Sequence, residues 1–124
     1  MLSGEHIRTN LNIYNMATQL GENSVKGTEF KVNINMTPID NRHMSDIEWE
    51  CLVFTETSHK TLTINKREAI KVDSDNYIIR IDSNVCGAGK YYVTLTAYVP
   101  DEDFIDGIRT ERRTMFTGIT IDAR

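Results

Sequence analysis

Tyr91-Tyr92-Val93-Thr94-Leu95-Thr96-Ala97-Tyr98-Val99 is the stretch that decides the fold. Every second residue from Tyr91 to Val99 is apolar, and the positions between them hold only tyrosine and threonine. Successive side chains of a β-strand point to opposite faces of the sheet, so a period of two predicts a strand with one face in a core. This is the longest uninterrupted alternation in the chain, and we expect it to form the centre of a sheet.

The same alternation recurs in six further stretches, at residues 29–36, 47–53, 62–64, 70–72, 77–81 and 115–121. Polar turn residues separate them, for example at 73–76 and 82–89. No long stretch carries a helical apolar stripe, and residues 66–69 suffice for one helical turn at most. Short strands joined by polar turns are typical of sandwiches. We therefore predict an all-β, immunoglobulin-like antiparallel β-sandwich of about seven strands.

Three residues of the predicted core carry polar or reactive groups. Trp49 lies on the inward-facing side of its strand, where its ring would fill the space between two sheets and its indole N–H would need a partner. Cys51 falls within a strand pattern and Cys86 just before another. A secreted immunoglobulin domain bridges its sheets with such a pair, but Cys86 comes too early in its strand. We expect both cysteines to be free and buried.

Length and composition indicate one ordinary globular domain. The chain has 124 residues, 40% hydrophobic and 26% charged, with a net charge of −4 and a pI near 5.3. Nucleic-acid binders usually carry a basic excess, so this balance argues against that class. The first residues lack a basic segment followed by an apolar one, and no apolar run is long enough to span a bilayer. We expect a protein that is made and folded in a cytoplasm and has no membrane partner.

Residues 1–27 have a different character and are assigned to an N-terminal arm, with the sandwich over 28–124. Ile7, Leu11 and Ile13 alternate with polar residues, and a polar, glycine-containing stretch follows over residues 21–27. Terminal arms are poorly ordered unless a neighbour holds them. The alternative is that Arg8–Tyr14 forms an eighth strand of the same sandwich.

The sequence contains no recognisable catalytic, cofactor or metal motif. The histidines and cysteines are not spaced as metal ligands, and Gly87-Ala88-Gly89-Lys90 opens a strand where a phosphate loop would open a helix. The acidic stretch 101–106 offers oxygen ligands to calcium but lacks the EF-hand spacing, and a solvated loop is favoured. We predict a non-enzymatic protein without cofactor or metal.

The connection after the central strand, between Tyr98 and Thr114, is long and mixed in character. It contains apolar Phe104, Ile105 and Ile108 within an acidic stretch, followed by Arg109, Arg112 and Arg113. Long connections are often functional, and apolar side chains beside arginine are typical of protein contacts. Two interpretations stay open: these six residues contact another protein, or the apolar ones cover the end of the core.

Several segments together resemble a known family. They are Gly27–Val32, Ile47–Cys51, Asp75–Ile79, Gly89–Val93, Val99–Phe104 and Asp106–Glu111. Over residues 27–122 the chain resembles small immunoglobulin-like virion proteins of tailed phages that infect Bacteroides, the crAss-like phages, and more distantly the N-terminal domain of baseplate upper proteins. The resemblance implies an auxiliary capsid (decoration) protein, present in many copies on the virion. Its expected partner is the major capsid protein, and it would be made in the host cytoplasm.

Two other functions remain open. One is a tail, baseplate or fibre component of the phage. The other is an adhesion or glycan-binding module of a bacterial surface, which needs exposed aromatic rings for sugar stacking. Tyr92 and Tyr98 share one strand face and Tyr91 points to the other, so cross-strand packing is the simpler expectation.

The arm offers a second candidate contact, made of Ile7, Arg8, Leu11, Ile13 and Tyr14. An extended segment of this kind can add a strand to the open sheet edge of a partner. On this hypothesis, deletion of residues 1–20 leaves the domain folded and abolishes incorporation into particles.

Overall fold

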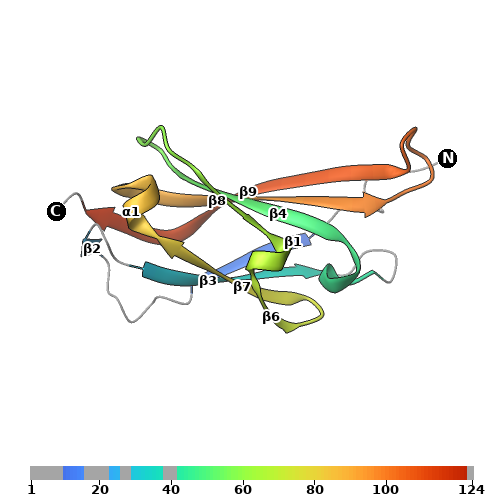
Figure 1. Ribbon diagram of the computed structural model, residues 1–124, viewed down its shortest axis with the longest axis horizontal. Helices are drawn as coiled ribbons and strands as arrows, with labels where there is room; N and C mark the ends of the chain where they lie inside the picture. The colour runs from blue at the N-terminus through green and yellow to red at the C-terminus, as the bar shows by residue number, and fades with distance from the viewer. Residues whose placement is uncertain (1–9, 16–22, 26–28, 38–41, 123–124) are drawn as a thin grey trace.

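A computed structural model describes residues 10–15, 23–25, 29–37 and 42–122, and within these ranges nine strands form two sheets. The sheets lie one above the other as two layers (Figure 1). The strands are β1 (Asn10–Asn15), β2 (Asn23–Val25), β3 (Glu29–Thr37), β4 (Glu48–Thr55), β5 (Leu62–Asn65), β6 (Ile70–Asp73), β7 (Asn76–Asp82), β8 (Gly89–Pro100) and β9 (Ile108–Asp122). The predicted all-β sandwich is confirmed, and the alternating stretch Tyr91–Val99 forms most of β8.

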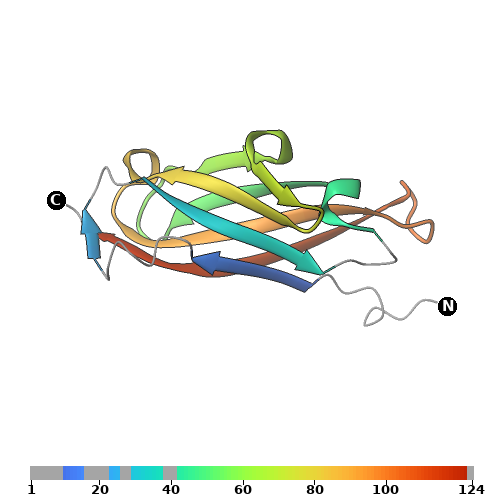
Figure 2. The ribbon, with the colours of Figure 1, turned by 90° about the horizontal axis from the view of Figure 1, so that it is seen from below.

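The strand order is that of an immunoglobulin-like sandwich. The four-stranded sheet has the order β1-β3-β7-β6, and Figure 2 shows its face. The five-stranded sheet has the order β2-β9-β8-β4-β5. Every neighbouring pair is antiparallel except β2 and β9, which run parallel. The core of this arrangement matches the two immunoglobulin sheets ABED and CFG, with β9 in the place of strand G.

The core lies where the two inner faces meet. On β4 the burial pattern alternates strictly from Glu48 to Val53, and the buried positions are the apolar ones. Residues 91, 93, 95, 97 and 99 of β8 are likewise all buried. The opposing sheet contributes the alternate residues of β3 and β7, from Phe30 to Met36 and from Tyr77 to Ile81. Full burial of one such side chain stabilises the fold by about 1.5–3 kcal/mol, so the alternation read from sequence is also the main source of stability.

The polar and reactive core residues lie largely as expected. Trp49 is 2% exposed and packs edge-on against Tyr77, with ring centroids 4.9 Å apart. Its indole Nε1 has no hydrogen-bond partner within the described ranges, so the expected partner is not seen there. Cys51 and Cys86 are free and buried, as predicted. Burial raises the pKa of both thiols.

A tyrosine closes the corner between the two sheets at the start of β8. Between β7 and β8 the chain makes one helical turn, α1 (Ser83–Cys86). Fully buried Tyr91 donates its hydroxyl hydrogen bond to the Gly87 carbonyl at 2.5 Å, with the Ser83 carbonyl 3.4 Å away. This is the arrangement of the tyrosine corner of immunoglobulin domains. It supplies a donor to the Gly87 carbonyl just beyond α1, while the Ser83 carbonyl already accepts the Gly87 N–H at 2.8 Å. Sequence reasoning had placed only a turn here.

Two segments of the predicted arm lie within the sheets. β1 pairs with β3 over six residue pairs, from Asn10 opposite Thr37 to Asn15 opposite Val32. β2 pairs with Thr120–Asp122 at the end of β9. For residues 10–15 and 23–25 an arm outside the domain is therefore wrong, and the alternative of a further strand describes β1. The physical reason is that an alternating terminal segment gains ladder hydrogen bonds by joining an edge of its own sheet.

The remaining comparisons with the sequence-based predictions concern the start of β9 and two short 3-10 helices. β9 begins at Ile108, earlier than the predicted residue 115, so Arg109, Arg112 and Arg113 belong to a strand. Residues 66–68 form the expected single turn, the 3-10 helix η4 (Lys66–Glu68). A second 3-10 helix, η3 (Met44–Asp46), precedes β4.

Candidate protein-contact site

The loop that joins β8 to β9 is short and internally bonded. It spans residues 101–107, and the Asp101 N–H donates to the Gly107 carbonyl at 2.9 Å. Inside this closure the Phe104 and Gly107 N–H groups donate to the Asp101 and Phe104 carbonyls. Asp101 and Asp106 also accept backbone N–H groups two residues further on, at 3.0 and 3.1 Å, as in Asx turns. The carboxylates therefore shape the loop, which holds a defined conformation.

The base of the loop is held by a buried arginine. Arg109 is on β9 with its side chain 7% exposed. Its Nη1 contacts the Asp101 carboxylate at 2.5 Å, and its Nε donates to Glu111 Oε2 at 2.7 Å. A planar guanidinium can serve two carboxylates at once, which a lysine ammonium does less well. Arg109 thus ties the first residue of the loop to the strand that follows it.

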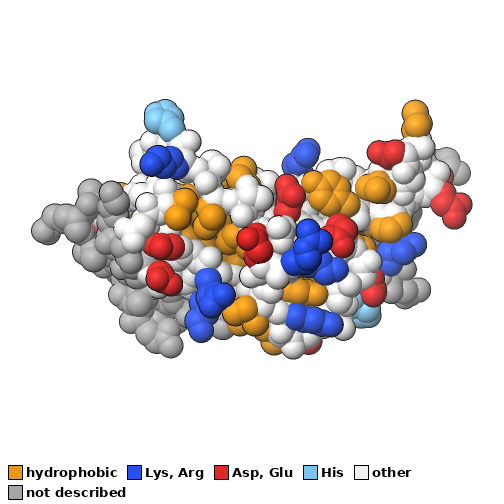
Figure 3. Space-filling view, viewed as in Figure 1, with side chains coloured by type: hydrophobic (Ala, Val, Ile, Leu, Met, Phe, Trp, Pro, Cys, Tyr) orange, Lys and Arg blue, Asp and Glu red, His pale blue; other side chains and the backbone are white. Residues whose placement is uncertain are grey.

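The apolar side chains of this loop point away from the core. Phe104 is 41% exposed, Ile105 108% and Ile108 42%. Around them lies a shallow hollow of about 510 Å³, which Asp106 and Thr110 also line. Figure 3 shows hydrophobic and acidic side chains together on the projecting end of the molecule. Of the two interpretations left open, covering the core is wrong for Phe104, Ile105 and Ile108, because all three side chains are exposed and none belongs to the core cluster.

The three arginines of the predicted site do not lie together on one surface. Arg109 is buried and structural, so an exposed role in contact is wrong for it. Arg112 and Arg113 are exposed on β9, where they lie opposite Thr96 and Leu95 of β8. Neighbouring residues of a strand face opposite ways, so the two side chains leave the strand on different sides. We name Phe104, Ile105 and Ile108 the hairpin tip and treat it as the candidate site.

The candidate residues of the arm fall into two groups. Ile7 and Arg8 lie outside the described residues. Leu11, Ile13 and Tyr14 belong to β1, with backbone positions opposite Met36, Ile34 and Asn33. One backbone edge of β1 is therefore already hydrogen-bonded to β3 within the domain.

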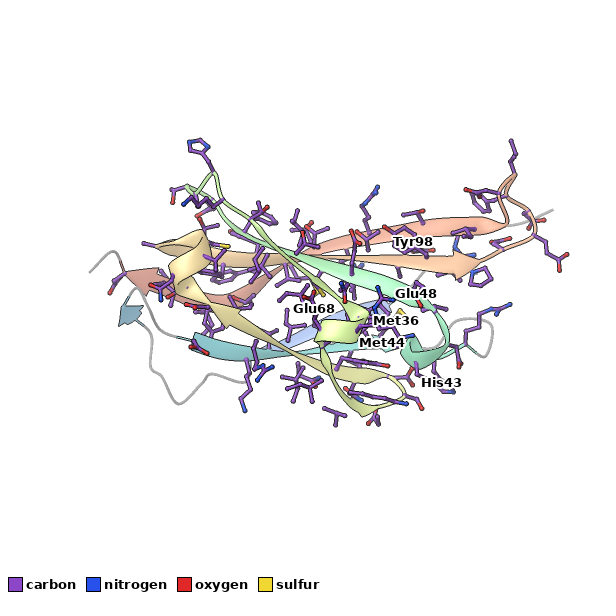
Figure 4. All side chains as sticks on the ribbon, in the orientation of Figure 1. Met36, His43, Met44, Glu48, Glu68 and Tyr98 are labelled. Atoms are coloured by element: carbon purple, nitrogen blue, oxygen red, sulfur yellow. The ribbon has the colours of Figure 1, made fainter. Side chains whose placement is uncertain are left out.

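A polar cluster holds the connection between β3 and β4 at the tip end. Asp75 accepts the Met44 N–H at 3.1 Å and lies 2.8 Å from His43 Nδ1. This hydrogen bond is the main reason that the pKa of His43 is raised, and the Asp75 and Asp46 charges add to it. Lys66 Nζ donates to the Ser45 and Ile47 carbonyls at 2.9 and 2.7 Å. In Figure 4, Met36 and Met44 lie at this end, with His43 further out. The cluster fastens loops and shows no arrangement suited to catalysis.

An aromatic row crosses the outer face of the five-stranded sheet. Phe54, Tyr92 and Phe116 lie on adjacent strands. The Phe54 and Tyr92 rings are 5.6 Å apart and inclined by 17°, and Phe116 is tilted by 43° to Tyr92 at 5.4 Å. At this distance and angle the Phe54 and Tyr92 rings are offset-stacked across neighbouring strands. This is cross-strand packing, the simpler expectation from the sequence.

Other kinds of site find no support in the described part of the chain. No three histidine, cysteine, aspartate or glutamate side chains converge there as metal ligands. In the same ranges, no helix has the length and apolar character needed to cross a membrane. No protein-family model matches the chain, and no curated protein matches it either.

Proposed function

We propose that this chain is a non-enzymatic virion protein that attaches to a larger protein surface through its hairpin tip. The observation that carries the proposal is the exposure of Phe104, Ile105 and Ile108 on a loop that Arg109 holds from below. Apolar groups that are exposed on a bonded loop have little conformational entropy left to lose on binding. A binding partner would bury them.

The position of the tip in the fold also supports a binding role. The β8–β9 loop corresponds to the F–G loop, one of three loops with which antibody variable domains bind antigen. This is an analogy of fold, and it says where such sandwiches commonly place contacts. The tip also lies at the end of two long strands, from which it reaches beyond the sandwich (Figure 1).

The phage assignment rests on the family resemblance of residues 27–122. We propose an auxiliary capsid protein bound to the major capsid protein, with a tail, baseplate or fibre position as the second candidate. The third candidate, a glycan-binding module, is less well supported because Tyr92 packs against Phe54 and Phe116 of the neighbouring strands. Neither phage candidate requires a cofactor or metal.

Mass spectrometry of purified phage particles, separated into heads and tails, tests the assignment. The chain should copurify with heads at many copies per particle. Recovery with tails would replace the capsid by the second candidate, and absence from both fractions would refute a virion role.

A variant pair tests the tip itself. Phe104→Ser combined with Ile105→Ser should fold normally and be lost from particles. Val72→Ser on β6 is the control, because Val72 is also exposed, at 55%, and lies on the other sheet. Equal incorporation of both proteins would show that the tip is not the contact.

A further inference from the structure

Within the described ranges, the outer edge of β9 is hydrogen-bonded to another strand only at its C-terminal end. There β2 pairs with Thr120–Asp122, while β1 of the other sheet lies beside β9 without pairing with it. On the other side β9 pairs with β8 from Ile108 onward. Within the described ranges no strand is therefore hydrogen-bonded to the edge beside Thr110, Arg112 and Thr114. Figure 2 shows β9 along the same long side of the sandwich as β1.

The hydrogen-bond pattern tells which backbone groups face this edge. The Asp101 N–H donates to the Gly107 carbonyl, so residues 101 and 107 form a hydrogen-bonded pair. Hydrogen-bonded and non-hydrogen-bonded pairs alternate along an antiparallel ladder. The register therefore places Arg109, Glu111 and Arg113 of β9 in the next three hydrogen-bonded pairs with β8. The N–H and C=O groups of the even residues, Thr110, Arg112 and Thr114, consequently point away from β8. They are the groups that an added strand would bond.

The sequence along this edge is nearly symmetric about Arg112. Two steps away on either side are Thr110 and Thr114, and one step away are Glu111 and Arg113. Four steps away are Ile108 and Phe116, both apolar and exposed at 42% and 45%. In an antiparallel pair related by a twofold axis, each residue meets its mirror position in the partner. Such a pair would bring together threonine with threonine, glutamate with arginine and apolar with apolar.

We propose that β9 pairs with β9 of a second copy, antiparallel and centred on Arg112, to form a symmetric dimer with a continuous sheet. The Glu111–Arg113 contacts occur twice and fall on non-hydrogen-bonded pairs, where side chains of opposite strands lie closest. Glu111 also accepts from Arg109 Nε, and a carboxylate accepts more than one hydrogen bond. This dimer shares only Ile108 with the hairpin tip and does not depend on the proposed function.

The same register creates one unfavourable contact, between Arg112 and its own copy at the axis. Like charges directly opposite each other destabilise a strand pair. Arg112→Thr should therefore tighten the dimer about two- to fivefold, since threonine also suits a strand. Arg113→Glu turns two attractive pairs into repulsive ones and should weaken the dimer at least about tenfold.

Sedimentation equilibrium of the full chain over a range of concentrations tests the proposal. Arg80→Glu is the control, because Arg80 is exposed on β7 of the other sheet. The expected order of affinity is Arg112→Thr, then wild type with Arg80→Glu, then Arg113→Glu. A wild-type chain that stays monomeric up to about millimolar concentration refutes the dimer. A dimer that responds equally to Arg113→Glu and Arg80→Glu refutes this interface.

Discussion

Removal of Arg109 gives the sharpest test of how the tip is held. Arg109→Met keeps a long apolar stem and deletes the charge between Asp101 and Glu111. The side chains of the two carboxylates are 11% and 18% exposed, so they lose their partner in a poorly solvated place. Breaking a buried ion pair costs about 3–5 kcal/mol. Because both carboxylates retain some contact with solvent, we expect the lower end, about 3 kcal/mol.

Urea denaturation followed by tryptophan fluorescence measures this loss, since Trp49 is the only tryptophan in the chain. With a slope of about 1.5–2 kcal/mol per molar urea, the midpoint should fall by about 1.5–2 M. Arg109→Lys should lie between wild type and Arg109→Met, because lysine keeps the charge without the planar fork. Arg80→Met is the control at an exposed position, where a change within about 0.5 kcal/mol is expected. If Arg109→Met unfolds at the same urea concentration as this control, the buried ion pairs do not hold the loop.

Four further outcomes are expected. Tyr91→Phe leaves the Gly87 carbonyl without its donor and should lower the free energy of unfolding, measured by urea denaturation, by about 1–3 kcal/mol, against almost nothing if the corner is unimportant. The pKa of His43 is raised above 6.5, so the contribution of this side chain to stability should be fully present below pH 6.5 and disappear as the pH rises through the raised pKa. The difference in free energy of unfolding between wild type and His43→Gln should therefore shrink between about pH 5 and pH 9. An advantage that grows with pH would contradict this sign. Cys51 and Cys86 should resist alkylation in the native state and react once urea unfolds the chain, and fast native labelling would show that they are not buried. Deletion of residues 1–20 should lower the unfolding midpoint, because it removes β1 from β3, whereas an unchanged midpoint would restore the idea of an independent arm.

The fold was predictable because its long strands β3, β4, β7 and β8 each have one buried face. Alternation alone found β3 to β8, and the β8 stretch needed no further information because its buried face repeats without a break from Tyr91 to Val99. The same method missed β2, whose three residues are too few to show a period. It also placed the start of β9 too late, since Arg109 occupies an inward position that a pattern search assigns to an apolar side chain.

The candidate site was predictable only in part. Phe104, Ile105 and Ile108 stood out as apolar residues in an acidic connection, but sequence could not decide whether they faced the core or solvent. The answer depends on how far β8 and β9 extend beyond the other strands, which is a property of the whole sandwich. The burial of Arg109 had one usable signal: acidic Asp101 and Glu111 lie where a hairpin brings them to either side of it.

The loop hydrogen bonds and ion pairs named above join residues within 101–111. In these bonds, residues 102–105 take part only through their backbone groups, so the bonds do not fix the side chains at those positions. Replacements there should be tolerated as long as Asp101, Asp106, Gly107 and Arg109 stay in place. If the hairpin tip is the contact proposed above, a new tetrapeptide at residues 102–105 would change the partner while the base of the loop stays the same.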